Sequence, residues 1–274
     1  MTDAAPTPIP RVVLHPDYGP ACPEARWVPA PRYLLRRSVI LDVLGDLPPG
    51  RYLEMGCGPG GLLHDLTRMG FETVGVDRSA SARRIGGHLL ADIPGLHVLE
   101  SAEDLPEASF DYLAAFEVLE HIEDDAAALA DWTRYLRPGG HVLISVPAHP
   151  ERWNPADVWA GHCRRYRRGD LAALIAGAGI KLDRILCYGF PLANVMELLS
   201  APIYAVQTRR RGGARMQQEA RTDESGSDRS LLTRLWPIYS SAPARRVMRG
   251  LWRIQRRHLT TERGVGFLAI GRKP

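Results

Sequence analysis

The amino-acid sequence predicts an α/β fold in which a mostly parallel sheet of seven strands carries helices on both faces. Two observations lead to this prediction. Short runs rich in β-branched and aromatic residues alternate with stretches in which apolar residues recur at helical spacing. A glycine-rich segment, residues 54–60, follows the first such run, and a turn of this kind joins a strand to a helix where a ligand approaches the backbone.

The expected elements can be assigned in order along the 274 residues. Residues 1–31 contain eight prolines and are expected to form an extended arm, which is followed by a helix from Arg32 to Leu47. The expected strands are 52–55, 73–76, 97–100, 112–116, 141–146, 181–187 and 265–272. The expected helices between them are 60–69, 80–90, 125–136 and 168–178, and a turn is expected over 137–140. Residues 32–190 and 264–274 therefore form the predicted main domain.

Residues 191–263 form a long insertion before the last strand, far beyond an ordinary loop. They contain an apolar stretch over 192–206, a polar stretch near 207–230 that is expected to be mobile, and a basic amphipathic stretch over 231–258. Residues 208–258 hold 13 arginines against four acids in a chain whose net charge is +4. The insertion is interpreted as a lid over a substrate, as a membrane-surface element through 191–258, or as a nucleic-acid contact.

The composition and the cysteines of the chain indicate where in the cell the protein is expected to be found. The chain has 45% hydrophobic residues but lacks a run of 18 consecutive apolar residues, so no membrane span is expected. The N-terminus has neither a basic region nor an apolar stretch, so no signal peptide is expected. Cys22, Cys57, Cys163 and Cys187 lack metal-type spacing and are interpreted as reduced thiols. These features predict a cytoplasmic protein, with peripheral membrane contact left open.

The glycine-rich segment predicts a nucleotide-containing ligand. Gly56, Gly58 and Gly60 let the backbone approach a ligand where a Cβ would clash. Asp77 ends the next apolar run and lies where a carboxylate can accept hydrogen bonds from ribose hydroxyls. The spacing of Gly56, Gly58 and Gly61 also fits a dinucleotide-binding dehydrogenase, so spacing alone does not separate the two ligand classes.

Six landmarks taken together resolve this ambiguity. They read LEMGCGPG at 53–60, VD at 76–77, AEDLP at 102–106, FEVLEH at 116–121, LRPGG at 136–140 and GHCRRY at 161–166. In this order the sequence resembles a class I S-adenosyl-L-methionine (SAM)-dependent methyltransferase, of the type 11/12-like class related to ubiquinone-type O-methyltransferases. The resemblance covers residues 32–190 and 265–274, and it implies a Rossmann-like fold with an antiparallel last strand. It also implies SAM as the methyl donor, with S-adenosylhomocysteine as the product.

The resemblance assigns one half of a cofactor pocket to the glycine turn. Gly56, Cys57, Gly58 and Gly60 would pass under the methionine and ribose portions of SAM. Glu54, two positions before the first glycine, would hold the ammonium group of the methionine portion.

The other half of the implied pocket comes from the following strands. Asp77 would bind the ribose hydroxyls, and Phe116 would offer its carbonyl to the ammonium group. Relatives often have an Asp that contacts adenine where this chain has Ser101, so the adenine contact is expected to fall to the backbone of Ala102, to Glu103 or to Asp104.

Glu117, Glu120 and His121 form the next group of candidate residues. Their i, i+3, i+4 spacing predicts that they share one face of a helix. Similar motifs in ubiquinone-type and RNA 2′-O-methyltransferases are implicated in binding a divalent cation, with a downstream histidine for which His162 is the candidate. In the alternative interpretation, which is favoured, the acids stabilise a helix N-terminus and His121 packs beside the cofactor.

His162 and His121 are the predicted catalytic residues, and His149 is a weaker candidate for a general base. The predicted function is methyl transfer from SAM to a small-molecule or lipid-like acceptor, at oxygen. A catalytically silent SAM-binding module and an RNA 2′-O-type methyltransferase remain as alternatives.

Overall fold

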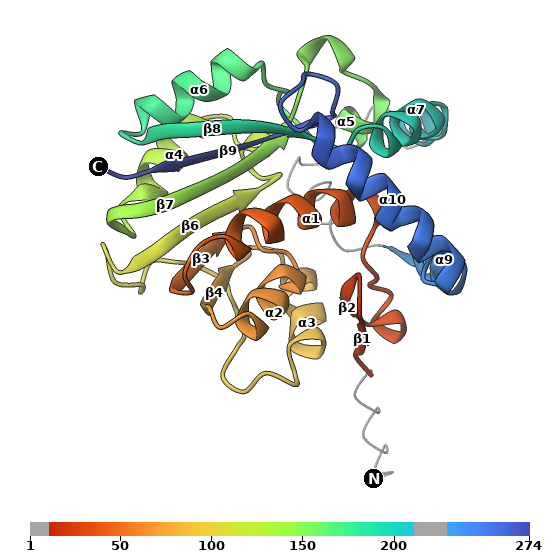
Figure 1. Ribbon diagram of the computed structural model, residues 1–274, viewed down its shortest axis with the longest axis horizontal. Coiled ribbons are helices and arrows are strands. Elements are labelled where there is room, and N and C mark those ends of the chain that lie inside the picture. The colour runs from red at the N-terminus through yellow and green to blue at the C-terminus, as the bar shows by residue number, and fades with distance from the viewer. Residues whose placement is uncertain (1–10, 211–228) are drawn as a thin grey trace.

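The computed structural model describes residues 11–210 and 229–274, and within them it contains the predicted mostly parallel sheet (Figure 1). The strand order is β5-β4-β3-β6-β7-β9-β8, and only β9 runs antiparallel to its neighbours. The strands are β3 (Arg51–Met55), β4 (Glu72–Val76), β5 (Val98–Leu99), β6 (Phe110–Phe116), β7 (Leu136–Pro147), β8 (Lys181–Tyr188) and β9 (Gly266–Arg272). The predicted fold class is therefore confirmed.

Helices cover both faces of the sheet and bury its apolar side chains (Figure 1). The side chains of α1 (Pro31–Gly45) and α2 (Gly61–Arg68) form one core with the sheet. Those of α4 (Asp125–Thr133) and α6 (Arg168–Gly177) form the other. The helix α3 (Ala80–Leu89) follows β4, and the short helix α5 (Pro155–Ala160) follows β7. The carboxyl ends of β3, β4, β6 and β7 therefore meet at one edge, where ligands of such sheets bind.

The N-terminal segment is packed onto the domain, which differs from the expected extended arm. Among its described residues, β1 (Val13–His15) pairs with β2 (Gly19–Ala21), and the short helix η1 (Pro23–Ala25) follows. The side chains of Tyr18 and Trp27 are fully buried. Burial of two large aromatic side chains stabilises a packed segment more than the prolines favour an extended one.

The insertion contains three described helices, α7 (Leu192–Arg210), α9 (Ser230–Tyr239) and α10 (Ala242–His258). The predicted polar stretch near 207–230 lies largely outside the described residues. Gln255 anchors α10, because its side-chain amide accepts a hydrogen bond from the Gly189 backbone at 2.7 Å and donates one to Leu35 O at 3.0 Å. Among the described helices, none has both the length and the apolar composition that a membrane span requires.

The expected turn over 137–140 is wrong, because β7 begins at Leu136 and runs through these residues. Leu136 pairs with Phe110, and the register of β6 and β7 then shifts before the pair Tyr112 and His141. Gly139 supplies the positive φ of +76° within this irregular strand start. A strand with an irregularity thus accommodates a Pro-Gly-Gly sequence that ordinarily signals a turn.

Candidate active site

The glycine turn between β3 and α2 brings the backbone close to neighbouring elements on one side and leaves space on the other. Gly56 has φ +69°, and a Cβ at this position would lie 2.5 Å from Cγ2 of Val118. Gly58 has φ +56°, but a Cβ there would meet no other atom within 4 Å. Gly56 is therefore required by packing against the segment after β6, whereas Gly58 borders open space at the strand ends.

Asp77 holds this turn from the end of β4. One oxygen of its carboxylate accepts a hydrogen bond from Gly58 N at 2.7 Å, and the other accepts one from Ser79 N at 2.9 Å. Ser79 in turn caps α3, since its hydroxyl accepts from Ala82 N. A carboxylate oxygen can accept more than one hydrogen bond, so these two bonds do not by themselves prevent Asp77 from accepting others from hydroxyl groups.

Glu54 is buried at the end of β3, where its carboxyl accepts a hydrogen bond from the Tyr52 hydroxyl at 3.2 Å. Burial raises the pKa of Glu54 to about 8, although Tyr52 and the charge of Arg36 act in the opposite direction. Without a bound cation, this carboxyl is therefore largely protonated at neutral pH. Burial also raises the pKa of the Cys57 thiol well above its usual value, so this residue stays neutral in the turn.

The remaining residues of the predicted cofactor pocket lie after β5 and β6. Ser101 and Glu103 are exposed, and the Ser101 hydroxyl accepts a hydrogen bond from Glu103 N at 3.2 Å. Ala102 is buried. Phe116 is buried at the end of β6, the strand that pairs with β3 next to the glycine turn.

The expectation that Glu117, Glu120 and His121 share one helix face is wrong. Glu117 has φ +59°, and only the single turn of 3₁₀-helix Leu119–His121 follows it. A residue with positive φ cannot continue a right-handed helix, so the i, i+4 geometry does not arise. The backbone N–H of Glu117 instead donates to Ser145 O, which keeps this residue at the sheet edge.

As a result, the carboxylate of Glu117 faces α1 and β8. It accepts a hydrogen bond from the Tyr188 hydroxyl at 2.7 Å and lies 3.6 Å from Arg32 and 3.7 Å from Arg36. Burial alone would raise the pKa of Glu117, but the two guanidinium groups outweigh it and hold the pKa below its usual value. Glu117 is thus an ionised carboxylate within a partly buried ion-pair group.

Glu120 and His121 do come together with the downstream His162. One ligand atom from each of these three side chains lies within 4.8 Å of the other two. Glu120 is 0% exposed, and neither of its carboxylate oxygens has a hydrogen-bond partner among the described residues. Burial, followed by the charge of Glu117, raises the pKa of Glu120 well above its usual value. Burial, followed by His162, lowers the pKa of His121 to about 4.

His162 occupies a fixed position in this cluster. Its Nδ1 lies 2.9 Å from Oδ1 of Asp157, and its Nε2 lies 4.0 Å from Oε1 of Glu120. The rings of His162 and His121 meet edge to face, with centroids 4.8 Å apart. His149, the weaker candidate base, lies elsewhere, with Cys187 and Glu262 and against the ring of Phe267.

Four side chains beside the site belong to none of the predicted sets: Arg32, Arg36, Asp157 and Tyr188. The arginines extend from α1, which the sequence predicts as a helix without indicating which residues it contacts. Asn154 and Asp157 form a capping box at the start of α5, so their spacing identifies a helix start but not the histidine partner of Asp157.

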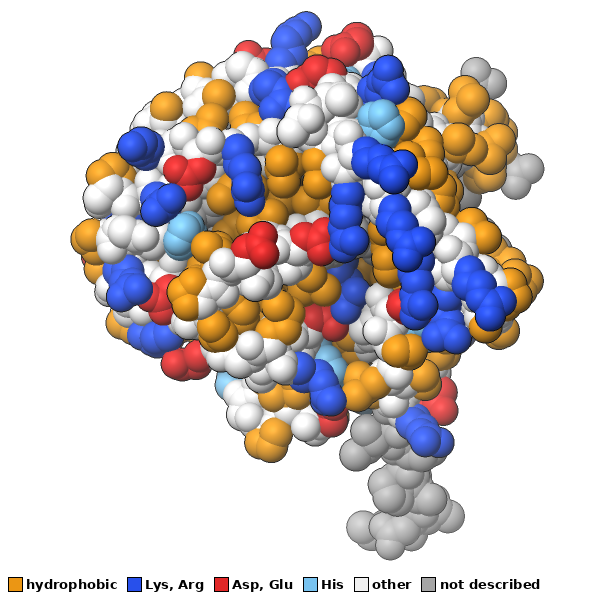
Figure 2. All heavy atoms as spheres, in the orientation of Figure 1, with side chains coloured by type: hydrophobic (Ala, Val, Ile, Leu, Met, Phe, Trp, Pro, Cys, Tyr) orange, Lys and Arg blue, Asp and Glu red, His pale blue; other side chains and the backbone are white. Residues whose placement is uncertain are grey.

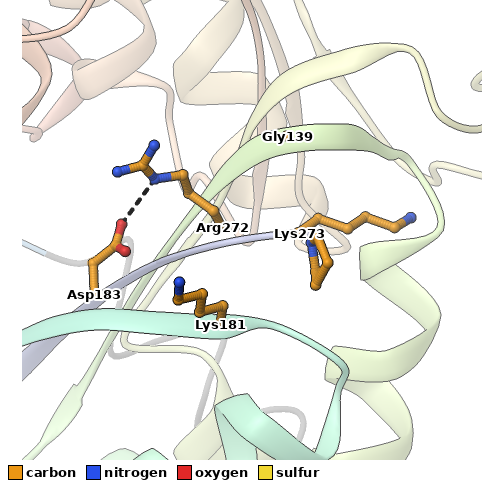
Figure 3. Close-up of a pocket in the computed structure, with 6 residues that line it drawn as sticks. Gly139, Lys181, Asp183, Arg272 and Lys273 are labelled. Carbon is orange, nitrogen blue, oxygen red and sulfur yellow. Dashed lines mark hydrogen bonds and ion pairs between the residues drawn. The ribbon is translucent and has the colours of Figure 1, made fainter.

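A separate pocket lies at the opposite edge of the sheet, where β8 begins and β9 ends (Figure 3). Its lining includes Lys181, Lys273 and Arg272, and Nε of Arg272 donates to Asp183 at 3.1 Å. The glycine turn and the Glu120 cluster lie at the other end of the strands, so this pocket is not part of the candidate active site.

Comparison with known proteins identifies the class. A family model described as a methyltransferase domain matches residues 30–185. The chain therefore belongs to the methyltransferase domain family, and the predicted class of SAM-dependent methyltransferases is confirmed.

Individual relatives agree with this class. A ubiquinone biosynthesis O-methyltransferase of Alkalilimnicola ehrlichii is 34% identical over 117 residues, which cover 41% of this chain and 47% of the relative. The chain thus spans about half the length of this curated relative. A protein of Mycolicibacterium smegmatis described as a probable SAM-dependent methyltransferase is 30% identical over 188 residues, 64% of this chain and 70% of the relative. A SAM-dependent methyltransferase structure from Thermotoga maritima shares the fold, with a TM-score of 0.52, 17% identity and coverage of 88% of this chain and 89% of the other.

Proposed function

We propose that this chain transfers the methyl group of SAM to a hydroxyl oxygen of a small-molecule or lipid-like acceptor. The observation that carries the proposal is the cluster of Glu120, His121 and His162 beside the glycine turn. Val118 precedes Glu120 by two residues, and its side chain lies where a Cβ on Gly56 would be, so the segment that carries the cluster passes beside the glycine turn. The Alkalilimnicola relative is described as an O-methyltransferase, which also supports oxygen as the acceptor atom.

The cofactor is proposed to lie over the glycine turn. Gly58 borders open space, and the hydroxyl groups of the ribose would hydrogen-bond to Asp77. The ammonium group would contact Glu54 and the carbonyl of Phe116. The adenine would lie near Ser101, with Ala102 and Glu103, after β5.

The described residues fit a divalent cation at the Glu120 cluster. A fully buried carboxylate without hydrogen-bond partners is costly, and a cation would supply the missing partner for both oxygens. Two imidazoles and one carboxylate suit metals such as manganese, iron or zinc. When bound, such an ion lowers the pKa of a hydroxyl that it contacts. Glu117 is held by Arg32 and Arg36 outside this cluster.

The chain's own residues would contribute position and proton transfer. His121 is neutral at physiological pH and offers a nitrogen lone pair, either to a cation or to the acceptor proton. His162 presents Nε2 to the same space. The sulfonium of SAM is already activated, so placing the acceptor oxygen in line with the methyl group supplies much of the rate.

The proposal is tested by methyl transfer to a panel of phenolic and lipid-like acceptors, before and after removal of metal with a chelator. We expect activity to be lost on chelation and in Glu120→Gln, whereas Glu123→Gln, an exposed acid of the same segment, retains it. Full activity after chelation and in Glu120→Gln would overturn the role of the cluster. Binding of S-adenosylhomocysteine without turnover of any acceptor would favour the silent SAM-binding module.

A membrane surface is the proposed partner of the insertion. On α7, five exposed apolar side chains follow one face of the helix at spacings of three and four residues: Val195, Leu198, Leu199, Ile203 and Val206. Leu198 is 77% exposed. Figure 2 displays arginines along α10 and apolar side chains beside them over α7 and α9. Such a combination suits the interface of an anionic membrane and a lipid-like acceptor.

A further inference from the structure

We infer that Asp157 is a positioning residue that fixes the tautomer and the ring direction of His162, and that Arg165 and Glu197 connect this pair to helix α7. The inference rests on the proposed function, because it concerns a residue of the proposed site. It assigns a role to three charged side chains that the glycine turn and the Glu120 cluster do not explain.

The carboxylate of Asp157 is buried, with 2% of the residue exposed, and it acts as a hydrogen-bond acceptor through both oxygens. Oδ1 accepts from Nδ1 of His162 at 2.9 Å and from Nε of Arg165 at 2.8 Å. Oδ2 accepts from Nη2 of Arg165 at 2.8 Å and from Asn154 N at 2.8 Å.

Arg165 donates to both oxygens of Asp157, as it does to a carboxylate, and a carboxylate only accepts hydrogen bonds, so Nδ1 of His162 must carry the proton. In the neutral imidazole, Nε2 then has a lone pair, and this atom faces Glu120. A carboxylate that holds one nitrogen of a histidine fixes which nitrogen is available for metal or proton. Asp157 therefore directs the Nε2 lone pair into the proposed acceptor space.

Arg165 holds Asp157 in place. Its side chain is 1% exposed and contacts the carboxylate through two nitrogens, a geometry that fixes orientation as well as charge. Nη2 of Arg165 also donates to Oε1 of Glu197 on α7 at 3.0 Å, and Arg32 lies 3.9 Å from the same oxygen. The ring centroids of Trp159 on α5 and Tyr204 on α7 lie 5.0 Å apart, a second contact between the two helices. The position of the His162 ring therefore depends, through Asp157 and Arg165, on how α7 packs against the domain.

The test compares Asp157→Asn with the matched exposed variant Asp170→Asn in the full chain. An amide can donate to Nδ1, which moves the imidazole proton to Nε2 and removes the lone pair from the site. We expect the ¹⁵N NMR shifts of the His162 ring to report this change of tautomer in the ligand-free protein. We expect kcat to fall about 10- to 100-fold, while S-adenosylhomocysteine affinity changes by less than about twofold. Asp170→Asn should match the unaltered protein in all three measurements.

If Asp157→Asn does not fold, Arg165→Lys provides the second variant, because lysine keeps the charge but not the two-point contact. We expect a mixture of His162 tautomers and a smaller loss of kcat. An unchanged His162 tautomer together with unchanged kcat, in either variant, would overturn the inference. The NMR measurement requires no acceptor, so a changed tautomer in a protein that methylates nothing would count against the proposed function and leave the positioning role intact.

Discussion

The buried carboxyl of Glu54 predicts that cofactor binding releases a proton. With a pKa of about 8 in the ligand-free protein, this group is about nine-tenths protonated at pH 7. If the ionised carboxylate holds the cofactor ammonium, binding at pH 7 must release about 0.9 protons. Because one pH unit corresponds to about 1.4 kcal/mol, the affinity at pH 7 should be roughly tenfold below its high-pH plateau.

Calorimetry of S-adenosylhomocysteine binding in two buffers of different ionisation enthalpy measures this proton release directly. We expect the unaltered protein to release about 0.9 protons at pH 7 and its Kd to tighten up to about pH 8. Glu54→Gln should bind more weakly and release none at pH 7. Equal proton release by the two proteins, or none by the unaltered protein, would refute the role of Glu54 at the ammonium group.

Glu54→Gln, which should weaken cofactor binding, should stabilise the ligand-free protein at pH 7. The folded-state pKa of Glu54 lies above the ordinary value of 4.5, so its contribution to stability is lost as pH rises from about 4.5 to about 8. At pH 7 this loss amounts to about 3 kcal/mol, an upper estimate for a fully buried group. Glu54→Gln removes the loss, so the ligand-free variant should melt at a higher temperature than the unaltered protein at pH 7, with no such difference near pH 4.

Three further predictions concern the turn and the insertion. Gly56→Ala should lower the free energy of unfolding by about 1–3 kcal/mol in chemical denaturation, because its Cβ meets Val118 at positive φ, whereas the unobstructed Gly87→Ala should not destabilise. Asp77→Asn should weaken S-adenosylhomocysteine binding at least about tenfold by calorimetry, since each lost hydrogen bond to a charged group is worth about 1.5–3 kcal/mol; unchanged affinity would contradict the cofactor assignment. Leu198→Asp should reduce co-sedimentation with anionic vesicles, whereas Val13→Asp, which changes an exposed apolar residue outside α7, should not. Equal vesicle binding by the two variants would exclude α7 as the membrane contact.

The sheet could be predicted from the sequence because its signals are local. The alternation of strand-like and helical runs sets the element order, and the rules of parallel sheets then bring the strand ends to one edge. This reasoning predicted that Asp77 ends the strand next to the glycine turn, and β3 does pair with β4. Phe116 was assigned through the resemblance to SAM-dependent methyltransferases, and its strand β6 pairs with β3 on the other side. The resemblance to SAM-dependent methyltransferases implied the antiparallel last strand, and β9 does run antiparallel to β7 across a long insertion.

Details that depend on backbone strain or on distant contacts could not be predicted. The positive φ of Glu117 interrupts the motif, and nothing in the residue types around it signals that strain. The helix α5 ends at Gly161 with φ +77°, which brings His162 back to Asp157 across the helix end. The N-terminal arm packs because Tyr18 and Trp27 find apolar partners more than 50 residues away in sequence, among them Trp236 and Ile85. Which apolar side chains surround Tyr18 and Trp27 depends on the complete fold, so the residues near them in the sequence do not predict it.

The basic insertion shows why a charge surplus counted along a sequence overstates the charge available to a partner. On α10, Arg245 and Arg249 pair with Asp17 in the N-terminal segment, and Arg256 makes a two-point contact with Asp42 on α1. These arginines hold the insertion against the domain. The other three arginines of this helix, Arg246, Arg253 and Arg257, make no ion pair with a described residue.

Three available arginines limit how strongly α10 alone can bind nucleic acid. Each neutralised phosphate of a single strand contributes about −0.7 to the slope of log K against log salt, so three contacts give a slope of only about −2. An interfacial surface needs fewer charges, because the apolar side chains of α7 add their own burial. The arginines of α10 and the apolar side chains of α7 therefore favour a membrane partner over RNA. A slope of log K against log salt much steeper than −2 for RNA binding would favour RNA instead.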